Sequence, residues 1–252
     1  MTDQIAYMDD AAATAVGRDY KRRLLQLLDV RAGHSVVDLG CGPGTDLGAL
    51  VTASGADGNV IGVDRDLGML AEAGRRHPGV RLQEGNLTAL PLADGSVDRA
   101  RVDRVLQHVD SPDQAVNEAA RILKTGGLLA AAEPDWDTLA VADEDLETSR
   151  GFARYSAGRV RNPALGRDLV RLCTTAGLTV RSVEAIAVLF RDFGTADRIL
   201  GLTRNSERAI ADGELSPTYG KAWLRRLEAG PVVAGFTLYL VVAAKPARGG
   251  ET

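Results

Sequence analysis

Aromatic residues, cysteines and long apolar runs are all scarce in this chain of 252 residues. Aromatic residues make up only 4% of it, so each one that is present is a candidate for a specific role. The two cysteines, Cys41 and Cys173, cannot form a disulfide framework, which predicts a reducing compartment and hence the cytoplasm. No apolar run approaches membrane-spanning length, and the N-terminus lacks the pattern of a signal peptide, so we expect no membrane partner.

Positive charge is not in excess either. The 30 basic residues are outnumbered by 34 acidic ones, and the net charge of −4 argues against a nucleic-acid-binding surface. Three histidines are scattered without metal-ligand spacing, which predicts no metal site. The composition of 45% apolar and 25% charged residues is typical of a globular protein, and the length suits one α/β domain with elaborations.

A glycine-rich turn follows the first apolar strand, which we place at residues 36–39. Gly40, Gly42 and Gly44 predict a backbone with positive φ or with a ligand pressed against it, because a Cβ would obstruct both. Their G-x-G-x-G spacing differs from the G-x-G-x-x-G pattern of dinucleotide-binding turns. Asp38 lies at the strand end, where it would repel a pyrophosphate but attract an ammonium or sulfonium group.

Polar side chains also follow the next two predicted strands. Asp64 ends the apolar run 59–63, where a carboxylate accepts two hydrogen bonds from a ribose diol. Asn86 follows the run 80–84, and its amide offers both the donor and the acceptor that an adenine edge requires. These features predict a ligand that contains adenosine. Asp66 is placed to cap the helix expected over 67–76.

The stretches VVDLGCGPGTD, VIGVD, GNLTALPLADGSVD and VLQHVDSPDQAVNEAARILKTGGLL, taken together in this order, resemble a class I S-adenosylmethionine-dependent methyltransferase. The similarity is to the ubiquinone/menaquinone-biosynthesis type and its small-molecule relatives, and it covers the central half of the chain. It implies a Rossmann-like seven-stranded α/β sheet with the last strand antiparallel and helical cap insertions. The cofactor would be S-adenosylmethionine, and the partner a small-molecule substrate.

This resemblance implies a single domain over residues 1–252, with an N-terminal helical lid at 1–30 and substrate-cap helices at 138–168 and 192–230. The cap helices would allow a homodimer. We expect the fifth strand at 128–132 and helices over 143–172, 192–211 and 217–229. An amphipathic helix is predicted over 18–30, with Lys21, Arg22 and Arg23 on a solvated face.

The residues expected to contact the cofactor follow from these motifs. They are Tyr7, Asp38, Gly40, Cys41, Gly42, Asp64, Arg65, Met69, Asn86, Leu87, Val102, Asp103 and Gln107. Val102 would offer its backbone carbonyl to the ammonium group. Met69 would pack on the adenine or the ribose, or else only in the core. Tyr7 would reach the cofactor carboxylate, or else pack the N-terminal arm down.

Three side chains are candidate bases. His108 titrates near neutrality and follows the fourth strand, although a hydrogen-bonded structural role is the alternative. Glu133 and Asp137 follow the fifth strand, where they would orient or deprotonate a nucleophile. Trp136 would form a flat apolar wall of the substrate pocket, joined by Tyr155 and Arg159 from a basic series that is otherwise a solvated helix face.

Two rival functions remain open from the sequence. One is a protein that binds S-adenosylmethionine without methylating, such as a cyclase or a regulatory subunit, since fold and cofactor do not determine the reaction. The other is an NAD-dependent oxidoreductase on the same kind of glycine turn, which the spacing of the glycines and the expected pairing of the last two strands oppose.

Overall fold

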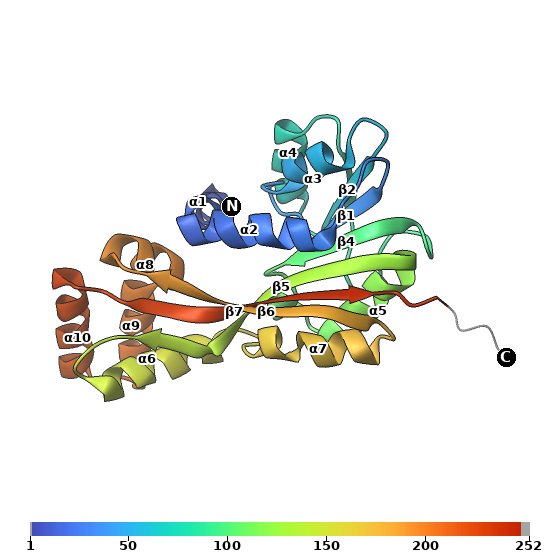
Figure 1. Ribbon diagram of the computed structural model, residues 1–252. Coiled ribbons are helices and arrows are strands. Elements are labelled where there is room, and N and C mark those ends of the chain that lie inside the picture. Colours follow the sequence, from blue (N-terminus) through green and yellow to red (C-terminus); the bar gives the residue numbers. More distant parts are fainter. Residues whose placement is uncertain (1, 248–252) are drawn as a thin grey trace.

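The computed structural model describes residues 2–247; Met1 and residues 248–252, which the predicted domain includes, lie outside the described part. A seven-stranded sheet with strand order β3-β2-β1-β4-β5-β7-β6 forms the centre of the molecule (Figure 1). The strands are β1 (Ser35–Leu39), β2 (Asn59–Asp64), β3 (Arg81–Glu84), β4 (Val97–Asp103), β5 (Leu123–Val141), β6 (Thr179–Phe190) and β7 (Ala234–Ala244).

The first five strands are parallel, and β7 lies antiparallel between β5 and β6. This arrangement confirms the predicted methyltransferase-like sheet. It also differs from the all-parallel 3-2-1-4-5-6 order of dinucleotide-binding sheets. Because parallel strands end at the same edge, the turns after β1, β2 and β4 meet at one carboxyl edge, where ligands of open sheets bind.

Helices cover both faces of the sheet (Figure 1). They are α1 (Thr2–Ala13), α2 (Ala15–Leu28), α3 (Leu47–Ser54), α4 (Leu67–Arg76), α5 (Pro112–Ile122), α6 (Leu146–Gly158), α7 (Leu165–Thr175), α8 (Phe193–Leu200), α9 (Leu202–Ala211) and α10 (Pro217–Ala229), with the short 3-10 helix η1 (Leu106–His108). Neighbouring residues of β1 enter different cores. Val36 packs in the same core as Tyr20 and Leu24 of α2, whereas Val37 packs in the second core, with residues of α5 and α7.

The strand β5 is much longer than expected. It continues past residue 132 to Val141, paired with β7 as far as Val141↔Ala234, so the first residues of the cap predicted from 138 are strand. Together β5, β6 and β7 form a two-faced extension beyond the carboxyl edge, with α8 on one side and α6 and α9 on the other (Figure 1). Pairing with a strand about 100 residues later decides this extension, and local patterning cannot report it.

The region 143–172 contains helices as predicted, namely α6 and α7, of which α7 packs on β5, β6 and β7. The helix expected over 192–211 is divided at Gly201, whose φ of 65° ends α8. By contrast, α4 and α10 begin and end where the sequence places them, and Asp66 caps α4 through hydrogen bonds from Gly68 N and Met69 N.

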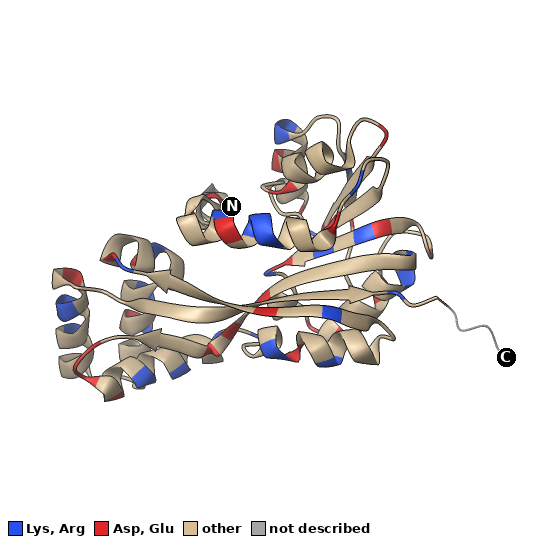
Figure 2. Cartoon of the chain, in the orientation of Figure 1, with Lys and Arg blue, Asp and Glu red and all other residues tan. Residues whose placement is uncertain are grey.

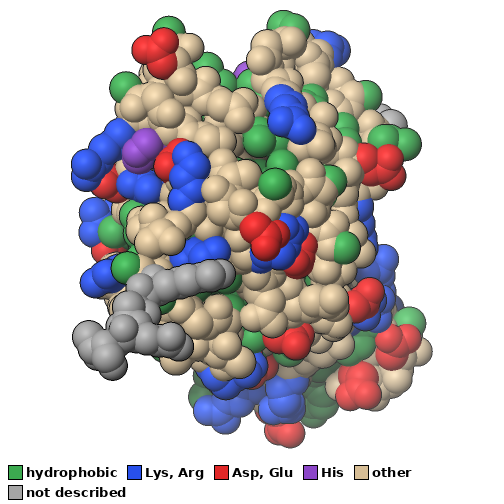
Figure 3. Space-filling view, turned by 90° about the vertical axis from the view of Figure 1, so that its right-hand side faces the viewer, with side chains coloured by type: hydrophobic (Ala, Val, Ile, Leu, Met, Phe, Trp, Pro, Cys, Tyr) green, Lys and Arg blue, Asp and Glu red, His purple; other side chains and the backbone are tan. Residues whose placement is uncertain are grey.

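Both signs of charge are distributed over the fold, and charged residues are present even on the central strand β4 (Figure 2). On the face turned to the viewer in Figure 3, basic and acidic side chains are interspersed rather than segregated. None of the described helices is long and apolar enough to cross a membrane. Across residues 2–247, no three His, Cys, Asp or Glu side chains gather in a way that would hold a metal ion.

Candidate active site

The glycine turn after β1 has the backbone that its composition predicts. Gly40, Gly42 and Gly44 have φ values of 74°, 53° and 82°. A Cβ on Gly40 would lie 2.6 Å from a methyl carbon of Val105, so the turn packs tightly against the segment after β4. Gly42 is more open, since a Cβ there would meet only the side chain of Met8, at 3.3 Å from its sulfur. The backbone of the turn at Gly42 is therefore covered by a flexible side chain of α1 rather than by backbone.

Asp64 holds this turn from the end of β2. Its Oδ2 accepts a hydrogen bond from Gly42 N at 2.8 Å, and its Oδ1 accepts one from Asp66 N at 3.0 Å. The carbonyl of Val63 accepts from the Gly40 and Cys41 amides at 2.7 and 3.0 Å. A carboxylate has about four lone-pair sites, so Asp64 retains acceptor capacity for a ligand diol.

The N-terminal helix α1 lies over the glycine turn and joins two parts of the fold. Asp9 forms a bidentate pair with Arg76 of α4, with both N–O distances at 2.8 Å. The hydroxyl of Tyr7 lies 3.5 Å from the carbonyl oxygen of Ile199 in α8. Through these contacts α1 spans from the helix beside the glycine turn to the helices of the extension, and it covers the carboxyl edge.

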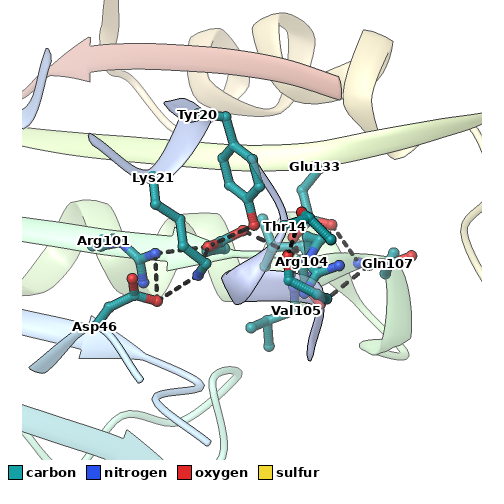
Figure 4. A network of polar contacts seen from close by, with 12 residues as sticks. Thr14, Tyr20, Lys21, Asp46, Arg101, Arg104, Val105, Gln107 and Glu133 are labelled. Atoms are coloured by element: carbon teal, nitrogen blue, oxygen red, sulfur yellow. Dashed lines mark hydrogen bonds and ion pairs between the residues drawn. The ribbon is translucent and has the colours of Figure 1, made fainter. Parts of the chain in front are cut away.

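A buried ion network lies beneath α2, next to the same edge (Figure 4). Arg101 of β4 contacts Asp38 at 2.8 Å, Asp46 at 2.8 Å and Asp103 at 2.7 Å. Lys21 of α2 contacts Asp46 at 2.6 Å and Asp103 at 2.7 Å. Burial alone would raise the pKa of Asp103, but the Lys21 ammonium and the Arg101 guanidinium outweigh it and hold that pKa below its usual range.

This network corrects one prediction and bears on two others. Lys21 is buried rather than solvated, with a side-chain exposure of 15%, whereas its neighbour Arg22 is exposed at 66%. The carboxylates of Asp38 and Asp103 are nearly inaccessible, and both form ion pairs with Arg101. The local sequence did not reveal these pairs, because Arg101 is 63 residues from Asp38.

Glu133 has a structural position that argues against the predicted catalytic role. It is fully buried, and its Oε1 accepts hydrogen bonds from the amides of Val105 at 2.8 Å and Leu106 at 2.6 Å (Figure 4). Its Oε2 lies 3.4 Å from the amide of Gln107. Burial raises the pKa of Glu133 to about 8 despite these donors. Glu133 therefore holds the loop that carries His108.

His108 and Arg104 flank this loop. His108 is exposed at the end of η1. Partial desolvation lowers the pKa of its imidazole, and the positive charges of Arg104 and Arg65 lower it further, so the imidazole is neutral at pH 7. Arg104 has an αL backbone with φ of 55°, which is uncommon outside glycine and often marks a functional site. It lines a cavity of about 20 Å³, the size of one water, together with Tyr20 and Phe236. Arg104 is not among the site residues predicted from the sequence.

Trp136 connects the carboxyl edge to the extension. Its indole Nε1 donates to Gln107 Oε1 at 2.7 Å, and its ring packs on Phe236 with centroids 4.6 Å apart. Trp136 also lines a larger cavity, of about 430 Å³, between β5 and α6. Asp137 is exposed beside this cavity, with its Oδ2 3.4 Å from Arg167 Nη2.

The family of methyltransferase domains matches residues 37–131, the segment from β1 through the middle of β5. An uncharacterized 37.1 kDa protein of transposon Tn4556 in Streptomyces fradiae is 48% identical to the chain. The alignment covers 96% of this chain and 71% of that protein. A demethylmenaquinone methyltransferase of Paenarthrobacter aurescens is 35% identical over 50% of the chain and 49% of its own length. The aligned part thus spans about half of that relative.

A solved structure shares the fold. Geranyl diphosphate C-methyltransferase from Streptomyces coelicolor A3(2), in complex with S-adenosyl-L-homocysteine, superposes with a TM-score of 0.58 over 90% of this chain and 80% of the other, at 19% identity. The chain belongs to the class I S-adenosylmethionine-dependent methyltransferases. Its cofactor is S-adenosylmethionine. The oxidoreductase interpretation is thereby excluded, in agreement with the sheet order.

The methyltransferase site fits this cofactor on structural grounds. The backbone at Gly42 is covered by the flexible side chain of Met8, and Asp64 has free acceptor capacity beside it. The amide oxygen of Asn86 accepts from Thr88 N at 3.1 Å, which leaves the exposed side-chain NH₂ free to donate. Met69 and Leu87 are buried in the protein core, and the neighbouring Arg65 is exposed.

Two predicted substrate residues lie elsewhere. Tyr155 donates its hydroxyl to Asp212 Oδ2 at 2.6 Å, and Arg159 lies 5.7 Å from the centre of the Tyr155 ring. Both side chains therefore make their contacts at the surface with other residues of the protein. The cavity beside Trp136 is lined instead by Arg150 and Arg154, one turn apart on α6. Helical spacing alone did not distinguish these arginines from the others in the basic series.

Proposed function

We propose that this methyltransferase transfers the methyl group of S-adenosylmethionine to a small metabolite held at the carboxyl edge of the sheet, beside η1 and beneath the N-terminal helices. The proposal rests on the arrangement around Gly42. Asp64 accepts a hydrogen bond from the Gly42 amide, and Met8 of α1 lies over this residue. A lid formed by α1 and α2 suits a reaction that must exclude water. The buried free thiols of Cys41 and Cys173 support action in the cytoplasm.

In this proposal the cofactor lies across the ends of β1, β2 and β4. Asp64 accepts hydrogen bonds from the ribose hydroxyls, and Asn86 pairs with the adenine edge. The remaining contacts are assigned to Tyr7, Gly40, Cys41, Gly42, Arg65, Met69, Leu87, the backbone of Val102, and Gln107. The acidic pair Asp38 and Asp103 acts indirectly, by holding Arg101 and Lys21 so that α2 and the glycine turn keep their positions.

When bound, the sulfonium supplies a reactive methyl group, so the main task of the protein is alignment. Positioning the acceptor in line with the methyl–sulfur bond accounts for much of the rate. His108 is the proposed base for an acceptor that must lose a proton, because its imidazole is exposed at this edge and neutral at pH 7. Glu133 positions the His108 loop through its backbone amides.

Asp137 is the weaker candidate for the base. It is exposed, and its Oδ2 already lies 3.4 Å from Arg167 Nη2, which engages the carboxylate within the protein. It lies within β5, next to Trp136, rather than in the loop after β4. The proposal therefore assigns proton transfer to His108 and leaves Asp137 at the wall of the cavity.

Incubating the purified protein with S-adenosylmethionine labelled in its methyl group and a bacterial metabolite extract tests this function. We expect label to enter a small-molecule fraction, and the His108→Gln variant to lose most of this transfer while binding the cofactor as before. Titration calorimetry with S-adenosylmethionine and NADH serves as the binding control. Tight binding of S-adenosylmethionine without any transfer would favour the non-methylating alternative.

A further inference from the structure

The larger cavity is a groove between the outer half of β5 and one face of α6. It has a volume of about 430 Å³, which lies within the range of small-molecule sites. Its apolar walls come from Trp136, Leu139, Val141 and Leu146. Leu146 is 56% exposed, an unusual position for a large aliphatic side chain that leaves apolar surface available in the groove.

Two guanidinium groups border this apolar surface. Arg150 and Arg154 lie one helical turn apart on α6, so their side chains are neighbours on the groove. Neither forms an ion pair with any residue in the range 2–247. The acidic residue in the lining, Asp137, contacts Arg167 instead, and Asp143 near the start of α6 pairs with Arg226. The groove thus combines an apolar wall with two uncompensated positive charges.

The inner end of the groove meets the proposed methyl-transfer edge. Trp136 donates to Gln107 of η1, and its own amide donates to the carbonyl of Pro163 at 2.7 Å. Ala157 lines the same end, just before the loop whose Asn162 amide donates to the Gln107 carbonyl at 3.1 Å. From Ala157, the helical rise of about 1.5 Å per residue places Arg154 roughly 5 Å and Arg150 roughly 10 Å farther out along α6.

We propose that this groove binds the body of the methyl acceptor, which is an elongated, mostly apolar molecule with an anionic group. Its reacting end lies beside Trp136, and its carboxylate or phosphate lies about 5–10 Å away, between Arg150 and Arg154. Guanidinium groups suit either anion because they present paired N–H donors. This inference rests on the proposed function, since it describes the substrate of that same site.

Decanoate is a simple probe of this chemistry, with decanol as its uncharged counterpart. The chain has two tryptophans, and Trp223 is fully buried against Phe152, so a change in intrinsic fluorescence on binding reports Trp136. We expect saturable quenching by decanoate. The double variant Arg150→Gln/Arg154→Gln should raise the decanoate dissociation constant at least tenfold and leave that of decanol within twofold.

The matched control is Lys221→Gln/Arg225→Gln, which removes two positive charges from exposed positions on α10, outside the groove lining. It should bind decanoate like the unmodified protein. The inference is overturned if decanoate does not quench, if the α6 variant binds it normally, or if both variants lose affinity equally. Labelled methyl transfer to the metabolite extract is measured on the same preparations: transfer without decanoate binding refutes only the groove, whereas decanoate binding without transfer refutes the proposed function.

Discussion

Replacing Asp64 with alanine separates the role of this carboxylate in cofactor binding from its role in the fold. The side chain accepts two backbone amides, from Gly42 and Asp66, and in our proposal it also accepts the two ribose hydroxyls. A hydrogen bond to a charged group contributes about 1.5–3 kcal/mol. Taking the lower value for two hydroxyls, Asp64→Ala should weaken S-adenosylmethionine binding by about 3 kcal/mol, or roughly 150-fold in dissociation constant.

Asp66→Ala is the matched control. Asp66 also accepts two backbone amides, from Gly68 at 2.8 Å and Met69 at 3.1 Å, but we assign it no contact with the ribose. Loss of this helix cap costs about 1 kcal/mol of stability. We therefore expect both variants to be destabilised in urea unfolding, and only Asp64→Ala to lose cofactor affinity in titration calorimetry.

Two ligands that differ only in one ribose hydroxyl test whether Asp64 binds the ribose diol. The unmodified protein and Asp66→Ala should bind 5′-methylthioadenosine about tenfold more tightly than its 2′-deoxy counterpart, a difference of about 1.4 kcal/mol. The Asp64→Ala variant should bind the two ligands equally. If Asp64→Ala still binds 5′-methylthioadenosine about tenfold more tightly than the 2′-deoxy ligand, then Asp64 does not bind the diol, and the cofactor is oriented differently from our proposal.

Three further perturbations test the surrounding structure. Lys21→Met should destabilise the fold by about 3–5 kcal/mol in urea unfolding because it leaves buried carboxylates unpaired, whereas the exposed Arg22→Met should cost less than about 1 kcal/mol; similar losses would contradict the network. Glu133 has a folded-state pKa of about 8, raised above its ordinary value of 4.5, so its contribution to stability is complete below pH 4.5 and is lost as the pH rises to 8. The stability difference between the parent and Glu133→Gln, measured by urea unfolding from pH 4.5 to 9, should therefore fall over that interval, and a constant difference would refute the assignment. Asp9→Asn should break the pairing with Arg76 and increase hydrogen exchange in α1 while leaving exchange in β1 unchanged; equal protection in both proteins would mean that this pair does not hold the lid.

The sequence by itself determined the features that depend on neighbouring residues. The positive φ of Gly40, Gly42 and Gly44 follows from the absence of a Cβ in a tight turn. The bounds of α4 follow from the Asp66 cap and from helical periodicity. The order of the motifs was sufficient to predict the seven-stranded sheet and the methyltransferase family.

The tertiary structure decided the features that depend on distant partners. Lys21 is buried because Asp46 and Asp103, 25 and 82 residues away, neutralise it, so its place on a helix says little about its exposure. Glu133 supports η1 because the loop after β4 folds against the middle of β5, where this side chain is buried. Solvation, charge pairing and cavity shape are set jointly by segments that only folding brings together, and for this reason Arg104 and the two arginines of the groove emerged from the structure alone.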